Sequence, residues 1–182
     1  MEDISLHLLD LAQNSIAAGA NLVEVSIREL PKEDCTWIQI RDNGKGMDEH
    51  QLNQAVSPFY TTRTTRKVGL GIPLFRASAE ATGGSLQIQS HKGTGTTLLA
   101  LFRSSHIDCL PMGKLEDSMV SLIFLNPEVN FVYSHEIMGR QFQLDTREIR
   151  KILGEVNITD PEVIDWIKDY IKNGLEELNG GA

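Results

Sequence analysis

The order of hydrophobic and polar positions predicts a chain of alternating helices and strands. Apolar residues recur every three or four positions over residues 3–18, which is the spacing of an amphipathic helix. Residues 21–30 instead alternate between apolar and polar, which is typical of a strand with one buried face. The same reasoning predicts a strand at 35–42, a weak helix at 48–56, a long loop at 58–71, a helix at 71–82, and a hairpin formed by SLQIQSHKG and GTTLLALF.

The pattern changes near residue 104, where the helix breakers Pro111 and Gly113 indicate a junction. The segment EDSMVSLIFLNPE fits a helix or a strand, and a cap at Asp117 or Ser118 with the stop at Asn126-Pro127 favours a helix. The elements expected after it are a hairpin around Met138-Gly139, a short helix from Asp145 to Gly154 with a capping box of Asp145 and Glu148, and a last helix capped by Asp160 with Pro161 first.

This order of elements predicts an α/β (α+β) two-layer sandwich, in which helices cover one face of a mostly antiparallel, mixed sheet. We divide the chain into residues 1–104 and a small α+β extension, residues 105–182.

Composition narrows the class of protein. The net charge of −8 argues against a protein that mainly grips nucleic acid. The two cysteines form no CxxC pair, and no apolar run reaches the ~18 residues that a membrane span needs. Because the acidic N-terminus is no signal peptide, we expect a reduced, cytoplasmic protein with no membrane partner.

Four short motifs carry the candidate chemistry: LLDLAQNS (8–15), DNGKGM (42–47), VGLG (68–71) and GTGTT (93–97). No GxxxxGK[ST] phosphate loop is present. In this order, the motifs resemble the ATP-binding domain shared by histidine kinases, type II topoisomerases, mismatch-repair ATPases and a heat-shock chaperone (the GHKL superfamily, Bergerat fold). The resemblance covers about residues 4–102. PFYTTR is most similar to the histidine-kinase branch, and QNSIAAGA to the mismatch-repair branch.

The resemblance implies ATP and Mg²⁺ as cofactors, and it assigns roles to residues of the first helix. Asn14 stands where the family's asparagine holds Mg²⁺ against the triphosphate, as a neutral oxygen ligand of a hard cation. Asp10 stands where topoisomerase-like members place the glutamate that activates water, although aspartate is one methylene shorter. His7, one turn earlier, is expected to be a surface histidine, with a hydrogen bond to Asp10 as the alternative.

The resemblance also implies which residues surround the adenine base of ATP. Asp42 would accept a hydrogen bond from the adenine amino group and so read the base. Gly44 and Gly46 would adopt positive φ angles and let the backbone pass close to the ring, with Met47 at the edge of the pocket. Thr96 would support Asp42 through its hydroxyl group, either directly or with a water between them, with Thr97 as the adjacent alternative.

The phosphates would lie under a lid formed by the loop at 58–71. The glycines of VGLG would let the backbone approach the phosphates, and the following helix would offer them its N-terminal N–H groups. Lys67 or Arg63 would contact the γ-phosphate. The residues that the resemblance assigns to this part of the site are Thr62, Arg63, Lys67, Gly69, Leu70 and Gly71.

Two functions remain open at this stage. The first is a Mg²⁺-dependent ATPase or protein kinase whose reaction depends on Asp10. Because the chain begins at the ATP-binding domain, we expect any phosphoacceptor to lie on another protein. The alternative is an ATP-gated module that binds a protein partner with little turnover. In that case, residues 105–182, whose role the sequence does not assign, would be a candidate for partner binding or homodimer formation.

Overall fold

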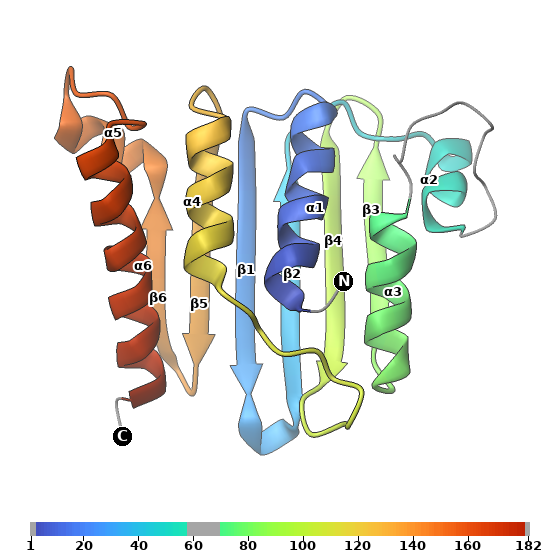
Figure 1. Cartoon of the computed structure of the whole chain (residues 1–182). Helices are drawn as coiled ribbons and strands as arrows, with labels where there is room; N and C mark the ends of the chain where they lie inside the picture. The colour runs from blue at the N-terminus through green and yellow to red at the C-terminus, as the bar shows by residue number, and fades with distance from the viewer. Residues whose placement is uncertain (1–2, 58–69, 181–182) are drawn as a thin grey trace.

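The computed structural model describes residues 3–57 and 70–180, which form one mixed six-stranded sheet with α1, α3, α4 and α6 on the same face (Figure 1). The order of the strands is β3-β4-β2-β1-β5-β6. β1 and β5 are parallel, and every other neighbouring pair is antiparallel. The predicted fold class, a mostly antiparallel mixed sheet with helices on one face, is therefore confirmed.

The helices and strands lie close to their expected positions. Their bounds are α1 Ile4–Ala17, β1 Leu22–Leu30, β2 Cys35–Asp42, α2 Glu49–Val56, α3 Gly71–Ala81, β3 Ser85–His91, β4 Gly95–Arg103, α4 Leu115–Leu125, β5 Asn130–Ile137, β6 Arg140–Asp145, α5 Thr146–Leu153 and α6 Pro161–Gly180. A single 3-10 turn, η1 (Pro31–Glu33), joins β1 to β2 and was not expected. The loop expected at 58–71 falls largely outside the described residues.

Two predicted helix caps are wrong in detail. α4 follows Lys114 and has no side-chain cap, so it begins before the expected Asp117 or Ser118. Asp145 caps α5 by accepting from the Arg147 N–H, without the expected return bond from Glu148. The capping box instead belongs to α2, where Asp48 and Gln51 bond to each other's backbone N–H groups.

Residues after 104 continue the same sheet rather than lying apart from it. β5 pairs with β1 from Leu22↔Asn130 to Glu29↔Ile137. The loop before α4 also bonds to the start of α1, because the N–H groups of Ile4 and Ser5 donate to the carbonyls of Pro111 and Met112, each at 2.9 Å. The division at residue 104 stays a prediction, and the sheet runs across it.

The core fills the space between the helices and the covered face of the sheet. Phe75 of α3 and Phe102 of β4 are almost fully buried there, with their ring centroids 5.4 Å apart. Ile38 and Ile40 of β2 lie on the same face and are also buried, so Asp42, two residues further, points toward the helices at the end of the strand. In the described part of the chain, no helix is long and apolar enough to cross a membrane.

Candidate functional site

Asp42 is held in a fixed orientation at the end of β2. Its Oδ2 accepts a 2.7 Å hydrogen bond from the Ser15 hydroxyl of α1, and its Oδ1 accepts a 2.9 Å bond from the Gly44 N–H. Each oxygen of an ionised carboxylate can accept more than one hydrogen bond. The half-buried Asp42 carboxylate therefore keeps acceptor capacity for a ligand while two protein donors fix its plane.

The glycines after Asp42 have different roles. Gly46 has φ +66°, and a Cβ there would collide with the backbone carbonyl of His91. Gly44 does not have a positive φ, so that prediction is wrong for Gly44. It is instead constrained by space, since a Cβ would lie 2.9 Å from the Ala18 carbonyl oxygen at the end of α1. Glycine is therefore needed at residue 46 for the positive φ angle and at residue 44 for the close approach to α1.

Backbone hydrogen bonds hold this turn on both sides. The Lys45 N–H donates to the Ala18 carbonyl at 2.9 Å, and the Lys45 carbonyl accepts from the Gly93 N–H at 2.6 Å. The turn is therefore tied to α1 and to the β3–β4 hairpin. These contacts fix the position of the backbone beside Asp42.

Thr96 faces Asp42 across the β2–β4 ladder, but its hydroxyl has a different partner. The Thr96 and Ser90 hydroxyls lie 2.8 Å apart, and the Ser90 oxygen also accepts the Met47 N–H at 2.8 Å. The hydroxyl that bonds directly to Asp42 is that of Ser15, and support of Asp42 by Thr96 through a water stays a prediction. Thr96 and Met47 lie in one network at the same end of the sheet, and their contact with a nucleotide stays a prediction.

Asp10 and Asn14 meet the beginning of α3. An added Cβ on Gly71 would lie 3.1 Å from Asp10 Oδ2 and 3.5 Å from Asn14 Nδ2, so both side chains reach the first residue of that helix. Leu70 precedes α3 without making a side-chain cap. The first N–H groups of a helix lack partners within the helix and carry its positive end, which favours an anion. A carboxylate, an amide and a helix N-terminus therefore converge.

The predicted lid residues Thr62, Arg63, Lys67 and Gly69 lie outside the described residues. Their roles stay predictions.

His7 does not lie on the surface, and that prediction is wrong. α3 packs over this side of α1, so the ring is only 1% exposed and lies 5.3 Å from the Phe75 ring, centroid to centroid. Neither ring nitrogen has a hydrogen-bond partner in the described part of the chain, so the alternative bond to Asp10 is not formed either. Burial lowers the pKa of His7 and outweighs the neighbouring Asp10 and Asp3, which raise it.

We expect His7→Leu to raise the free energy of unfolding by about 1 kcal/mol at pH 7.5, because it removes buried polar atoms that have no partner. The gain should grow below about pH 6.5, where the unfolded imidazole takes up a proton that the folded, lowered pKa resists. Urea denaturation at pH 7.5 and pH 5.5 measures both effects. The same substitution at the exposed His91 is the control, and an equal gain there would contradict the explanation.

Sequence reasoning missed Ser15 and Ser90 as parts of the site. Ser15 lies within the LLDLAQNS motif, and its position next to Asn14 was a usable signal. Ser90 could be found only from the hairpin register, which pairs it with Thr96. The bond between Ser15 and Asp42 joins residues 27 positions apart, and no local pattern indicates it.

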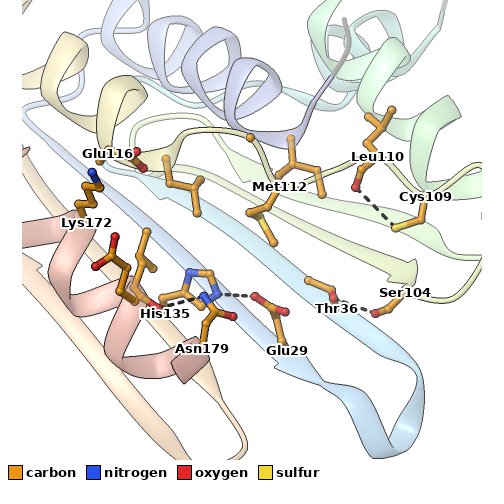
Figure 2. Close-up of a pocket in the computed structure, with 15 residues that line it drawn as sticks. Glu29, Thr36, Ser104, Cys109, Leu110, Met112, Glu116, His135, Lys172 and Asn179 are labelled. Carbon is orange, nitrogen blue, oxygen red and sulfur yellow. Dashed lines mark hydrogen bonds and ion pairs between the residues drawn. The ribbon is translucent and has the colours of Figure 1, made fainter. Parts of the chain in front are cut away.

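A separate cleft of about 500 Å³ lies toward the opposite ends of β1 and β2 and shares none of the predicted site residues (Figure 2). His135 is buried in its wall between two partners, with Glu29 Oε1 2.7 Å from Nε2 and the Tyr133 hydroxyl 2.7 Å from Nδ1. Burial first, then the charges of Glu29 and Glu116, raise the pKa of Tyr133 well above its ordinary value. Tyr133 therefore stays neutral, and this chain of bonds satisfies the imidazole within the wall.

Comparisons with known proteins cover the region of this site. Residues 2–105 match the family described as histidine kinase-, DNA gyrase B-, and HSP90-like ATPase. The sensor kinase CckA of Brucella abortus (strain 2308) is 32% identical over 80 residues, which are 43% of this chain and 8% of that protein. The sensor histidine kinase ZraS of Escherichia coli (strain K12) is 31% identical over 90 residues, 50% of this chain and 19% of that protein. The chain thus matches less than a fifth of the length of either relative.

Two solved structures share the fold over a longer stretch. The N-terminal domain of a DNA repair protein aligns with a TM-score of 0.55 at 16% identity, over 86% of this chain and 58% of the other. The Aquifex aeolicus MutL ATPase domain complexed with ADP aligns with a TM-score of 0.51 at 16% identity, over 84% of this chain and 69% of the other. At this identity the likeness concerns the fold alone. Its coverage is wider than that of the family match.

Proposed function

The chain belongs to the family of histidine kinase-, DNA gyrase B- and HSP90-like ATPases, and from this premise we propose that it binds ATP at the end of the sheet where Asp42 lies. The observation that carries the proposal is the carboxylate of Asp42, oriented by Ser15 and Gly44 beside a backbone turn that only glycine can form at residue 46. A fixed group that only accepts hydrogen bonds suits the amino group of adenine. It would leave the carbonyl of guanine unpaired.

The phosphate end of the proposed site lies at the start of α3. The N–H groups of Gly71 and Ile72 head an uncapped helix, which suits a phosphate group. The residues here also fit Mg²⁺, because Asp10 Oδ2 and the side-chain amide of Asn14, which carries an oxygen atom, both reach the start of α3, and hard cations prefer oxygen ligands. When bound, the ion would neutralise phosphate charge, with Asn14 as its protein ligand.

The proposed reaction is hydrolysis of ATP or transfer of its γ-phosphate to another protein. Asp10 supports this because it is exposed on α1, adjacent to the start of α3, where it could accept a proton from water or from a hydroxyl group. We expect the phosphoacceptor to be a different polypeptide and the protein to work in the cytoplasm, where ATP is abundant.

One observation favours the alternative, an ATP-gated module with little turnover. The loop at Pro111 and Met112 bonds to the first residues of α1, and the Ser118 hydroxyl of α4 donates to the Ser5 carbonyl at 3.0 Å. α1 also carries Asn14 and Ser15. A nucleotide that shifts α1 would therefore also shift the extension, where a partner could read the change.

Incubation of the purified protein with γ-labelled ATP and Mg²⁺ tests the reaction. We expect Asp10→Asn to lower phosphate release or transfer by roughly 100-fold or more, which is the usual contribution of a general base, while ATP affinity changes little. Asp108→Asn, at another exposed aspartate, is the matched control and should be silent.

The possible outcomes separate the two functions. Free phosphate that depends on Asp10 supports an ATPase, and label retained on a protein supports a kinase. ATP binding without either product would contradict turnover and leave the gated module. Absence of ATP binding would contradict both.

A further inference from the structure

Two large aromatic residues on α6 are exposed to solvent. Trp166 and Tyr170 are 53% and 40% exposed, and their rings stack with centroids 5.1 Å apart and planes 8° from parallel. Phe142 of β6 supports the stack from beneath, with its centroid 5.1 Å from that of Tyr170. We call Trp166 and Tyr170 the aromatic ridge. The stacking holds both rings in place, so a ligand would meet a preformed surface.

Grooves lie on both sides of the ridge. One, of about 320 Å³, runs between α6 and β6 and has Phe142 as part of its wall. Gly174 makes it possible, because a Cβ there would collide with the Phe142 ring. The other, of about 250 Å³, lies between α5 and α6 and is lined by Ile149, Ile152, Leu153, Val163, Trp166 and Glu162. Ile152 is 84% exposed and lines the same groove as Trp166, so exposed apolar side chains of α5 and of the ridge lie along one groove.

Contiguous apolar surface of this kind usually marks a place where another molecule binds. Trp and Tyr are the residues that most often dominate binding energy when they stand at the centre of such a surface. Phe124 of α4 is exposed to a similar extent but lines neither of these two grooves.

The charged side chains that line the two grooves are all acidic, although the Arg140 guanidinium lies nearby and donates to the backbone carbonyls of Glu177 and Leu178. In the described part of the chain, the residues that line the two grooves include three carboxylates, Glu162, Asp169 and Glu177, and no lysine or arginine. The nearby lysines of α6 face elsewhere: Lys168 pairs with Asp117 at 2.8 Å, and Lys172 lines the cleft in Figure 2. An occupant of this surface must therefore bring apolar side chains flanked by positive charge.

We propose that the aromatic ridge is the docking surface for a basic, amphipathic segment of a partner protein. A second copy of this chain is the less favourable occupant, because symmetric packing would bring the three carboxylates against their equivalents. The ridge lies at the edge of the sheet opposite α2 and α3 (Figure 1). A partner docked there would leave the Asp42 end of the sheet open. Docking is therefore independent of whether the proposed ATP chemistry takes place.

Two labelled peptides of identical length test the proposal by fluorescence anisotropy. Both carry leucine at helical i, i+3, i+4 and i+7 spacing, and the other positions are lysine in one and glutamate in the second. We expect the lysine peptide to bind at least about 10-fold more tightly, and Trp166→Ser and Tyr170→Ser each to weaken it by about 10-fold or more. Phe124→Ser, which removes an equally exposed aromatic side chain, should leave binding unchanged.

A charge exchange separates docking at the ridge from general attraction to an acidic protein. The triple variant Glu162→Lys, Asp169→Lys, Glu177→Lys should prefer the glutamate peptide. The triple variant Glu33→Lys, Glu49→Lys, Asp108→Lys makes the same change in net charge at exposed positions away from the ridge and should keep the original preference. Circular dichroism checks that each variant folds.

The proposal is overturned if neither peptide binds, if both triple variants respond alike, or if Phe124→Ser weakens binding as much as Trp166→Ser. It is also overturned if sedimentation shows a wild-type dimer that Trp166→Ser dissociates. That result would assign the ridge to a second copy of the chain.

Discussion

We expect the Asp42→Asn protein to fold normally and to bind ATP at least about 100-fold more weakly than wild type, because it replaces a charged acceptor at the base with an amide donor. The fold should survive because the asparagine oxygen can still accept the Gly44 N–H, and its amide group can donate to the Ser15 hydroxyl. A hydroxyl group serves as donor or acceptor, so both anchoring contacts remain satisfied. Titration calorimetry with a non-hydrolysable ATP analogue measures the loss.

Ser15→Ala should have a smaller effect on ATP affinity than Asp42→Asn. It removes one of the two anchors of Asp42 and leaves the carboxylate itself, so we expect only about a 3- to 10-fold weakening, the value of one hydrogen bond. The wild-type protein should prefer ATP to GTP, and Asp42→Asn should lose most of that preference. Equal affinity of wild type and Asp42→Asn for ATP would contradict the proposed contact between Asp42 and the adenine base.

Gly46→Ala should strongly destabilise the fold near the site. Alanine at φ +66° costs about 1–2 kcal/mol, and the collision of its Cβ with the His91 carbonyl adds a cost of about 1–3 kcal/mol for overpacking. We therefore expect the free energy of unfolding to fall by roughly 3 kcal/mol and ATP binding to be lost with the displaced turn.

Gly139→Ala is the matched control for this effect. Gly139 has φ +79°, but an added Cβ there has no neighbour within 4 Å, so this variant should lose only the backbone contribution of about 1–2 kcal/mol. The difference between the free energies of unfolding of the two variants, measured by urea denaturation, gives the cost of the collision at Gly46. Equal destabilisation of the two would mean that the close approach at Gly46 is unimportant.

Much of the fold and part of the site could be predicted from the sequence because their signals are local. The alternation over residues 21–30 and the helical spacing over residues 3–18 each report one buried face, and β1 and α1 follow them. DNGKGM similarly indicated a backbone turn after Asp42, and the structure has one there, whereas the role of Asp42 in binding stays a proposal. The wrong prediction at His7 concerns a contact with a neighbouring element, which no single stretch of the chain encodes. The wrong predictions for the φ angle of Gly44 and for the caps of α4 and α5 concern local backbone geometry instead.

The sequence by itself determined which segments form helices and strands and which family motifs the chain carries. The tertiary structure alone decided how these parts meet. It pairs β1 with β5 across more than 100 residues, brings Ser15 to Asp42, and closes α3 over His7. The physical reason is that the hydrophobic period fixes which face is buried but not what buries it. The partners of His7, Asp42 and the aromatic ridge therefore depend on packing between distant segments.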